Sequence, residues 1–83
     1  MRILNVVECI GNTLPNIISF VVKDDNEHEI IEKAELCLRE CIIKEEEGIL
    51  TDELLDDVVK NWYYYNKWGY QAGLIWSKYG TGI

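Results

Sequence analysis

The sequence contains one histidine, one proline and no apolar run that approaches the roughly 18 residues needed to cross a bilayer. His28 is the only possible base for Ser-His or Cys-His catalysis, and its neighbours Glu27 and Glu29 indicate a solvated first helical turn instead. No glycine-rich phosphate loop joins a strand to a helix. The acids also lie in runs, without the alternating oxygen ligands of a calcium loop. These absences predict a protein that is not an enzyme, holds no cofactor and contacts no membrane.

Cysteine is scarce, and its count of three is odd: Cys9, Cys37 and Cys41. Secreted disulfide scaffolds more often carry an even number, so we interpret these residues as free core thiols in a reducing compartment. Cys37 and Cys41 share one face of a predicted helix, but a zinc site would need two more ligands. Asn5 and Glu8 interrupt the apolar positions at the N-terminus, which is not typical of a signal peptide. We therefore expect a cytoplasmic protein without a metal.

Basic residues are few where the acids gather. Residues 24–57 hold fourteen of the fifteen acids against three basic residues, a net charge of 3 minus 14, or −11. Residues 58–83 hold three lysines and no acid. Because phosphate binding depends on Lys and Arg, the acidic middle should repel nucleic acid. It should attract a basic protein surface and speed association with that surface.

Hydrophobic periodicity predicts one α+β domain over residues 1–83, with the element order β-β-α-α-β. The segments Ile3–Ile10 and Ile17–Lys23 are rich in β-branched residues, and the short loop between them favours an antiparallel hairpin. Residues 70–77 alternate with a period of two and form the third predicted strand. We expect a three-stranded antiparallel sheet with two helices on one face, followed by a loosely ordered tail at residues 79–83.

Capping signals place the two predicted helices. Asn26 and Glu29 have the spacing of a capping box, and the first helix is expected to run from there to about Glu47. Thr51 is the expected N-cap of the second helix, which continues to Gly69. The inward stripe of this second helix is predicted to consist of Leu54, Leu55, Val58, Trp62 and Tyr65.

Aromatic residues are concentrated near the C-terminus, where eight of the nine lie between Trp62 and Tyr79. Four of them are expected to fill the core: Trp62, Tyr65, Tyr70 and Trp76. The other four are expected to be more exposed: Tyr63, Tyr64, Trp68 and Tyr79. Tyr and Trp are enriched at binding hot spots. Base stacking is disfavoured here, because only three lysines are nearby and the neighbouring field is strongly negative.

Seven acids form the candidate partner-binding surface: Glu45, Glu46, Glu47, Asp52, Glu53, Asp56 and Asp57. Rows of carboxylates at helical spacing can imitate the charges of a nucleic-acid backbone and occupy a basic groove. The exposed aromatics Tyr63, Tyr64 and Trp68 would anchor such a contact. The alternative interpretation, a solvated face that only keeps the protein soluble, remains open at this point.

In size, acidity and strand-helix layout, the chain resembles small inhibitors encoded by phages and mobile elements, such as the anti-CRISPR proteins. The resemblance implies a non-enzymatic phage protein in the host cytoplasm that binds and inhibits a nucleic-acid-handling host complex. Its acids at 45–57 would meet Lys and Arg on the target, with no direct contact to nucleic acid. The alternative is a structural or assembly module, a homodimer joined through the edge of its third strand or through its aromatic surface.

Overall fold

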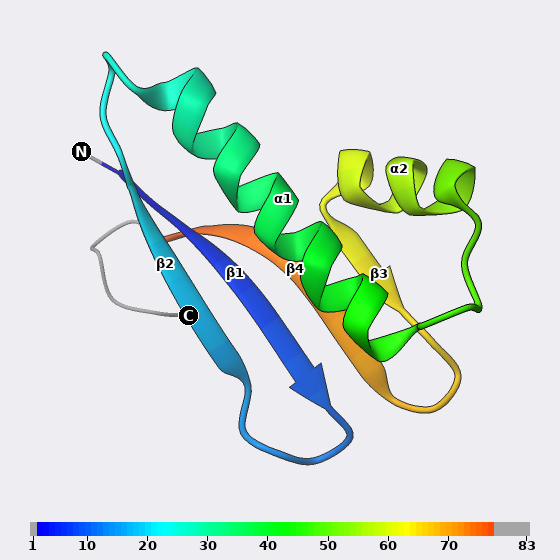
Figure 1. The fold of residues 1–83 in the computed structure, drawn as a ribbon. Helices are drawn as coiled ribbons and strands as arrows, with labels where there is room; N and C mark the ends of the chain where they lie inside the picture. The colour runs from blue at the N-terminus through cyan, green and yellow to red at the C-terminus, as the bar shows by residue number, and fades with distance from the viewer. Residues whose placement is uncertain (1, 78–83) are drawn as a thin grey trace.

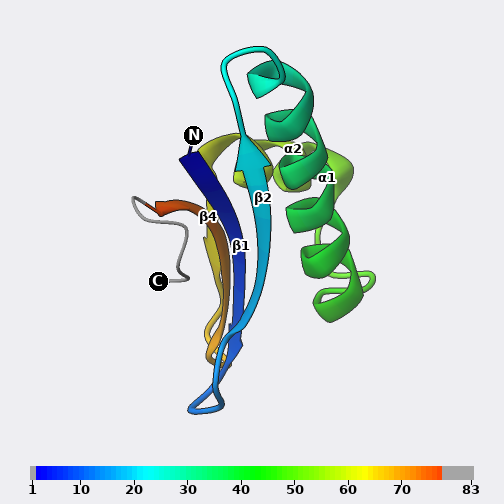
Figure 2. The same ribbon diagram turned by 90° about the vertical axis from the view of Figure 1, so that its left-hand side faces the viewer.

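The computed structural model describes residues 2–77 and is an α+β domain of two layers (Figure 1). Its elements, in chain order, are β1 (Arg2–Ile10), β2 (Asn16–Val22), α1 (Glu27–Glu45), α2 (Asp52–Asn61), β3 (Tyr63–Tyr65) and β4 (Tyr70–Ser77). The sheet is antiparallel throughout, with the strand order β2-β1-β4-β3. Both helices lie on one face of this sheet (Figure 2).

The hairpin of the first two strands is confirmed, and β1 lies in the middle of the sheet between β2 and β4. The third predicted strand is also confirmed, as β4. However, β4 is not an edge strand, because β3 pairs with it along Gln71–Gly73. A dimer joined through this strand would be limited to the part of β4 that extends beyond β3.

The prediction of a three-stranded sheet is wrong, because Tyr63–Tyr65 form a fourth strand. The second helix ends at Asn61, eight residues before the predicted end at Gly69. Trp62 has a left-handed backbone with φ of 61°, which a helix cannot continue through. The three tyrosines then favour a strand. Gly69, with φ of 90°, lies in the turn between β3 and β4.

The core lies between the helices and the sheet. Directly paired residues of antiparallel strands share a face, so Leu4 and Val6 of β1 lie on the helix side with Leu74 of β4. Leu38 of α1 and Leu55 of α2 pack onto this side. The remaining buried members of this core are Val22, Ala34, Ile42, Tyr70 and Ala72.

Both predicted N-cap positions are correct, but only one of the two side chains makes a capping hydrogen bond. Thr51 is confirmed, because its Oγ1 accepts a hydrogen bond from Leu54 N at 3.2 Å. The prediction of a capping box at Asn26 is wrong, because the Asn26 side chain makes no capping hydrogen bond to α1. Its Oδ1 instead accepts from Lys23 N at 2.7 Å, closing the turn that leads out of β2. Asn26 therefore stabilises the turn and not the helix.

Candidate functional site

The predicted acidic surface lies where α1 ends and α2 begins, on the helical layer. Three of the acids end α1 or follow it directly, and four lie in α2. The connecting loop, residues 46–51, brings these two groups together (Figure 1). Six of the seven side chains are exposed: Glu45, Glu47, Asp52, Glu53, Asp56 and Asp57.

Glu46 does not belong to the exposed surface, which corrects its assignment as a binding residue. Its residue is only 4% exposed, and its carboxylate accepts a hydrogen bond from Asn66 Nδ2. The Oδ1 atom of Asn66 accepts in turn from the backbone of Trp68 and Tyr70, at 2.8 and 3.0 Å. Glu46 therefore joins the loop after α1 to the turn between β3 and β4. It holds the loop beneath the acidic surface and is not itself exposed on that surface.

Five carboxylates remain without a basic partner. Arg39 of α1 forms an ion pair with Asp56 of α2 and so links the two helices. Within the described range 2–77, no ion pair involves the other exposed acids, which are Glu45, Glu47, Asp52, Glu53 and Asp57. Like charges gathered in this way repel one another, so a cation brought by a partner would be favoured.

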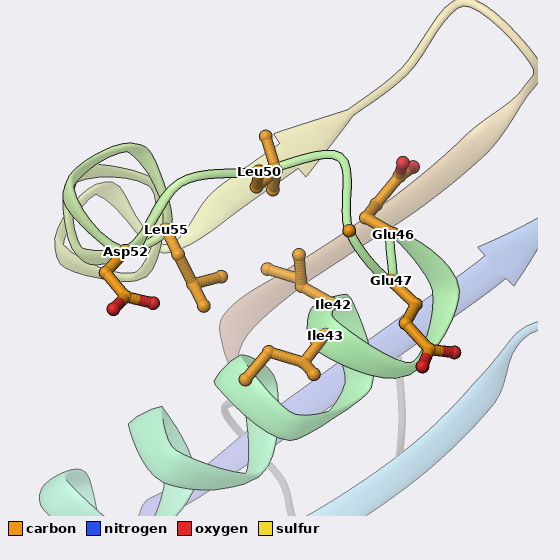
Figure 3. A pocket seen from close by; sticks show the side chains of 8 residues that line it. Ile42, Ile43, Glu46, Glu47, Leu50, Asp52 and Leu55 are labelled. Carbon is orange, nitrogen blue, oxygen red and sulfur yellow. The ribbon is translucent and has the colours of Figure 1, made fainter.

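A hollow of about 170 Å³ opens within this acidic surface (Figure 3). Ile42, Ile43 and Leu55 provide its apolar wall, and the carboxylates of Glu47 and Asp52 lie on opposite sides of these residues. The hollow is smaller than the roughly 300–1,000 Å³ of typical small-molecule sites. Its size suits one long side chain of a partner, with an apolar stem on the wall and a charged end at the rim.

The three predicted aromatic anchors are not brought together. Tyr63 points to the sheet face opposite the helices, because it pairs with Gly73. Trp68 is exposed in the turn between β3 and β4. Tyr64 is half-buried against the core, and burial, together with its hydrogen bond to Glu46, raises the pKa of its hydroxyl. An aromatic anchor beside the acids is therefore not formed from these three residues.

The aromatic core prediction is correct in part. Tyr70 is buried, and Trp62 is half-buried, with its Nε1 donating to Glu35 Oε2 at 2.8 Å. The prediction that Tyr65 fills the core is wrong, because its side chain is 66% exposed. Tyr65 belongs to strand β3 and not to the apolar stripe of a helix. Trp76 is 37% exposed, with its ring 6.1 Å from that of Trp62 and covered by Arg2. Tyr79 lies outside the described residues, as does the predicted tail at 79–83.

The thiols of α1 lie beside a second polar group, the carboxylate of Glu8. Burial, with Glu8 nearby, raises the pKa of Cys41 to about 11, and burial also raises the pKa of Cys37. Tyr70 donates its hydroxyl to Glu8 Oε2 at 2.8 Å, and its pKa is raised by burial and by this bond. Thiols that keep their protons are poor nucleophiles and poor metal ligands. In residues 2–77, no group of three or more His, Cys, Asp or Glu could hold a metal ion.

These raised pKa values predict that the folded protein loses stability in alkali. The unfolded chain releases the protons of Cys37, Cys41, Tyr64 and Tyr70 at lower pH than the folded chain does, so each rise in pH above about 9 favours unfolding. We expect a midpoint of thermal unfolding that is constant from pH 7 to 8.5 and falls steadily from pH 9 to 11. In a Cys37→Ala/Cys41→Ala variant the fall should begin nearer pH 10. A wild-type midpoint that is level up to pH 11 would contradict this expectation.

Sequence reasoning missed the sheet face that lies opposite the helices. Strand pairing assigns thirteen residues to this face: Ile3, Asn5, Val7, Cys9, Ile17, Ser19, Val21, Tyr63, Tyr65, Gln71, Gly73, Ile75 and Ser77. None of these residues is charged. The signal in the sequence is this lack of charge at alternate positions in all four strands.

The fold and surfaces together define a small two-layer α+β protein with an acidic helical layer and an uncharged sheet face. Comparison of the chain with protein-family models, curated proteins and solved structures gives no match. Among the described residues, no helix combines the length and apolar character needed to span a membrane.

Proposed function

We propose that the protein is a non-enzymatic binding protein whose acidic helical layer binds a basic surface of a nucleic-acid-handling protein and inhibits it. The observation that carries this proposal is the hollow beside Ile43, which lies between the carboxylates of Glu47 and Asp52, neither of which has an ion-pair partner within residues 2–77. An Arg or Lys side chain of the target fits this arrangement, since its stem would cover apolar surface and its charge would meet two anions. The surrounding acids Glu45, Glu53 and Asp57 would steer the encounter.

The charge distribution also supports a competitor of nucleic acid. A basic groove that binds phosphates recognises rows of negative charge, and the acidic surface at 45–57 presents five carboxylates that lack a basic partner within residues 2–77. In size and acidity the chain resembles anti-CRISPR proteins, which is the basis for placing the target among nucleic-acid-handling host complexes. Inhibition then requires only that the acidic surface competes with nucleic acid for the groove.

Neutralising the two carboxylates at the hollow tests this function. We expect Glu47→Gln/Asp52→Asn to weaken binding to the target at least tenfold, because both charges at the rim are lost while side-chain shape is kept. The matched control is Asp24→Asn/Asp25→Asn, which removes two exposed acids in the turn before α1 and should bind like the wild type. Substituting Glu47 and Asp52 is preferable to reversing the charge of Asp56, because the ion pair of Asp56 with Arg39 holds the two helices together.

The target is first captured on the tagged protein from a nuclease-treated bacterial lysate, released by salt and identified by mass spectrometry. Affinity is then measured by isothermal titration with the purified target, at 50 and at 500 mM NaCl, with and without double-stranded DNA. Steep weakening with salt and competition by DNA are expected. Equal affinity of both double variants, or binding that DNA does not affect, would contradict the proposal.

A further inference from the structure

A second hollow, of about 300 Å³, lies between α1 and α2. Leu36 of α1 and Val59 of α2 provide its apolar surface, and Leu36 is largely exposed. The polar residues that line it are Glu32, Glu35 and Arg39. We call the hollow beside Ile43 the first hollow, this one the second hollow, and the groove that contains both the α1–α2 seam.

The two hollows are aligned along one stripe of α1. Ile43 lines the first hollow and Leu36 lines the second. These residues are seven positions apart, which is about two helical turns or 10 Å, so they lie on nearly the same side of the helix. Both side chains are exposed. An exposed pair of apolar residues at this spacing is the pattern by which one helix receives another.

An ion pair holds the seam in shape between the two hollows. Arg39 lies on α1 between the residues that line the first and the second hollow, and it pairs with Asp56 of α2. On α2, Asp56 lies between Leu55 of the first hollow and Val59 of the second. The bridge therefore fixes the two helices before a partner arrives, and a preorganised groove costs less to bind.

The two hollows differ in the charges that they leave unpaired. In the first hollow, both rim carboxylates lack an ion-pair partner within residues 2–77. In the second hollow, Glu35 Oε2 accepts from Trp62 Nε1 at 2.8 Å, and His28 lies 3.2 Å from Glu32. The guanidinium of Arg39 is held by the ion pair described above. The first hollow therefore favours a cation, whereas the second, which is larger and has partnered polar groups, favours a bulky apolar side chain.

We propose that the α1–α2 seam binds one amphipathic helix of the target, with a basic residue in the first hollow and a bulky apolar residue, seven positions away, in the second. This inference rests on the proposed inhibitory function and names the element of the target that is recognised. Helices bound in grooves use anchors at such spacings. The polar residues around the second hollow would exclude water from the apolar anchor.

The charge of the helical layer identifies the occupant as a basic partner and not a second copy. Residues 24–57 carry a net charge of 3 minus 14, or −11, and this range contains all of α1 and most of α2. Two seams pressed together would bring these like charges into contact, which is unfavourable. A basic helix would instead bring the opposite charge to the same groove.

Synthetic peptides of identical composition test this inference without the target. Each is a 19-residue helix of alanine and glutamine with one arginine and one phenylalanine, seven residues apart in one peptide and five apart in the other. At a spacing of five, the two anchors lie on different sides of the helix. Both spacings are made in both chain orders. Each peptide is titrated up to 2 mM into the full ¹⁵N-labelled chain in 150 mM NaCl, and amide shifts are recorded.

We expect one of the peptides with the spacing of seven to bind at least tenfold more tightly than either peptide with the spacing of five. It should shift the amides of Leu36 and Ile43 with one dissociation constant, because one helix occupies both hollows. Equal binding at the two spacings, or no binding of any peptide at 2 mM, would overturn the inference. Shifts of the same amides when the chain alone is concentrated from 0.1 to 1 mM would place a second copy in the seam and also overturn it.

Leu36→Lys should weaken peptide binding at least tenfold, because it places a cation in the second hollow. The matched control is Leu54→Lys: Leu54 is 52% exposed on α2, Leu36 is 59% exposed on α1, and Leu54 lines neither hollow. The control should bind within twofold of the wild type. Circular dichroism checks that both variants are folded, and Leu36→Gln replaces Leu36→Lys if the latter is not. Equal losses in the two variants would contradict a role for the second hollow.

Binding of the target distinguishes a failure of this inference from a failure of the inhibitory function. If the target requires Glu47 and Asp52 but binds Leu36→Lys as it binds Leu54→Lys, the inhibitory function stands and the docked helix is overturned. If Glu47→Gln/Asp52→Asn leaves target binding unchanged, the inhibitory function fails. Peptide binding that still depends on the spacing of seven and on Leu36 would then support the seam as a site for a helix.

Discussion

Leu38→Ala should strongly destabilise the protein. Leu38 is fully buried at the middle of the helix and packs against the sheet. Removing such a side chain costs about 2–5 kcal/mol, because the lost transfer energy adds to that of the cavity left behind. The free energy of unfolding of a small domain is about 5–15 kcal/mol in total, so the variant should lose a large share of its stability. Urea unfolding followed by tryptophan fluorescence, at one protein concentration, measures the change.

The control for this truncation is two residues away. Leu36 lies on the same helix but is 59% exposed, so Leu36→Ala should change the free energy of unfolding by less than about 0.5 kcal/mol. Comparable losses from the two truncations would mean that α1 packs on the sheet with a different face from the one described above.

Gly73→Val should also be strongly destabilising, although strand propensity alone predicts a gain. Valine favours strands and glycine weakens them. However, a Cβ at position 73 would lie 2.7 Å from the carbonyl oxygen of Trp62. That oxygen accepts a hydrogen bond from Leu74 N at 3.0 Å, so it cannot move away without breaking the start of the β3–β4 pairing. Overpacking of this kind typically costs about 1–3 kcal/mol, and the backbone contact places Gly73→Val near the upper end.

Gln71→Val separates the gain in strand propensity from the steric clash. Gln71 lies on the same strand and the same sheet face as Gly73, two residues earlier, and its side chain is exposed. We expect this substitution to be neutral or slightly stabilising in the same urea experiment. If Gly73→Val were equally well tolerated, the close approach of Trp62 to β4 would not exist in solution.

Much of the fold could be predicted from local signals. The β-branched segments around Val6 and Ile18 identified the first hairpin, alternation identified β4, and Thr51 marked the start of α2. The fourth strand could not be predicted, because Trp62 and Tyr65 also have helical spacing. The choice between helix and strand depends on the left-handed backbone of Trp62. Glycine or asparagine usually adopts this conformation, so a tryptophan there gives no local warning.

The candidate site was predictable in composition but not in arrangement. Runs of acids correctly located the exposed carboxylates of Glu47 and Asp52. The burial of Glu46 depends on Asn66, which lies twenty residues later and meets it only in the folded chain. Similarly, both faces of β1 look apolar in the sequence, and only the packing shows that the helices cover one of them. Contacts between distant segments therefore decide which of the charged and apolar residues remain available to partners.

The central position of β1 and β4 has a consequence for how the chain folds as it is synthesised. These strands are paired from Ile3 with Ser77 to Ile10 with Tyr70, separations of 74 and 60 residues. Contacts this distant in the chain form slowly, because long loops must close before any pairing is gained. While the ribosome is still making β4, the edge of β1 that β4 later covers is unpaired. Such edges recruit other chains, so emerging chains are vulnerable to aggregation until β4 has been made and has paired with β1.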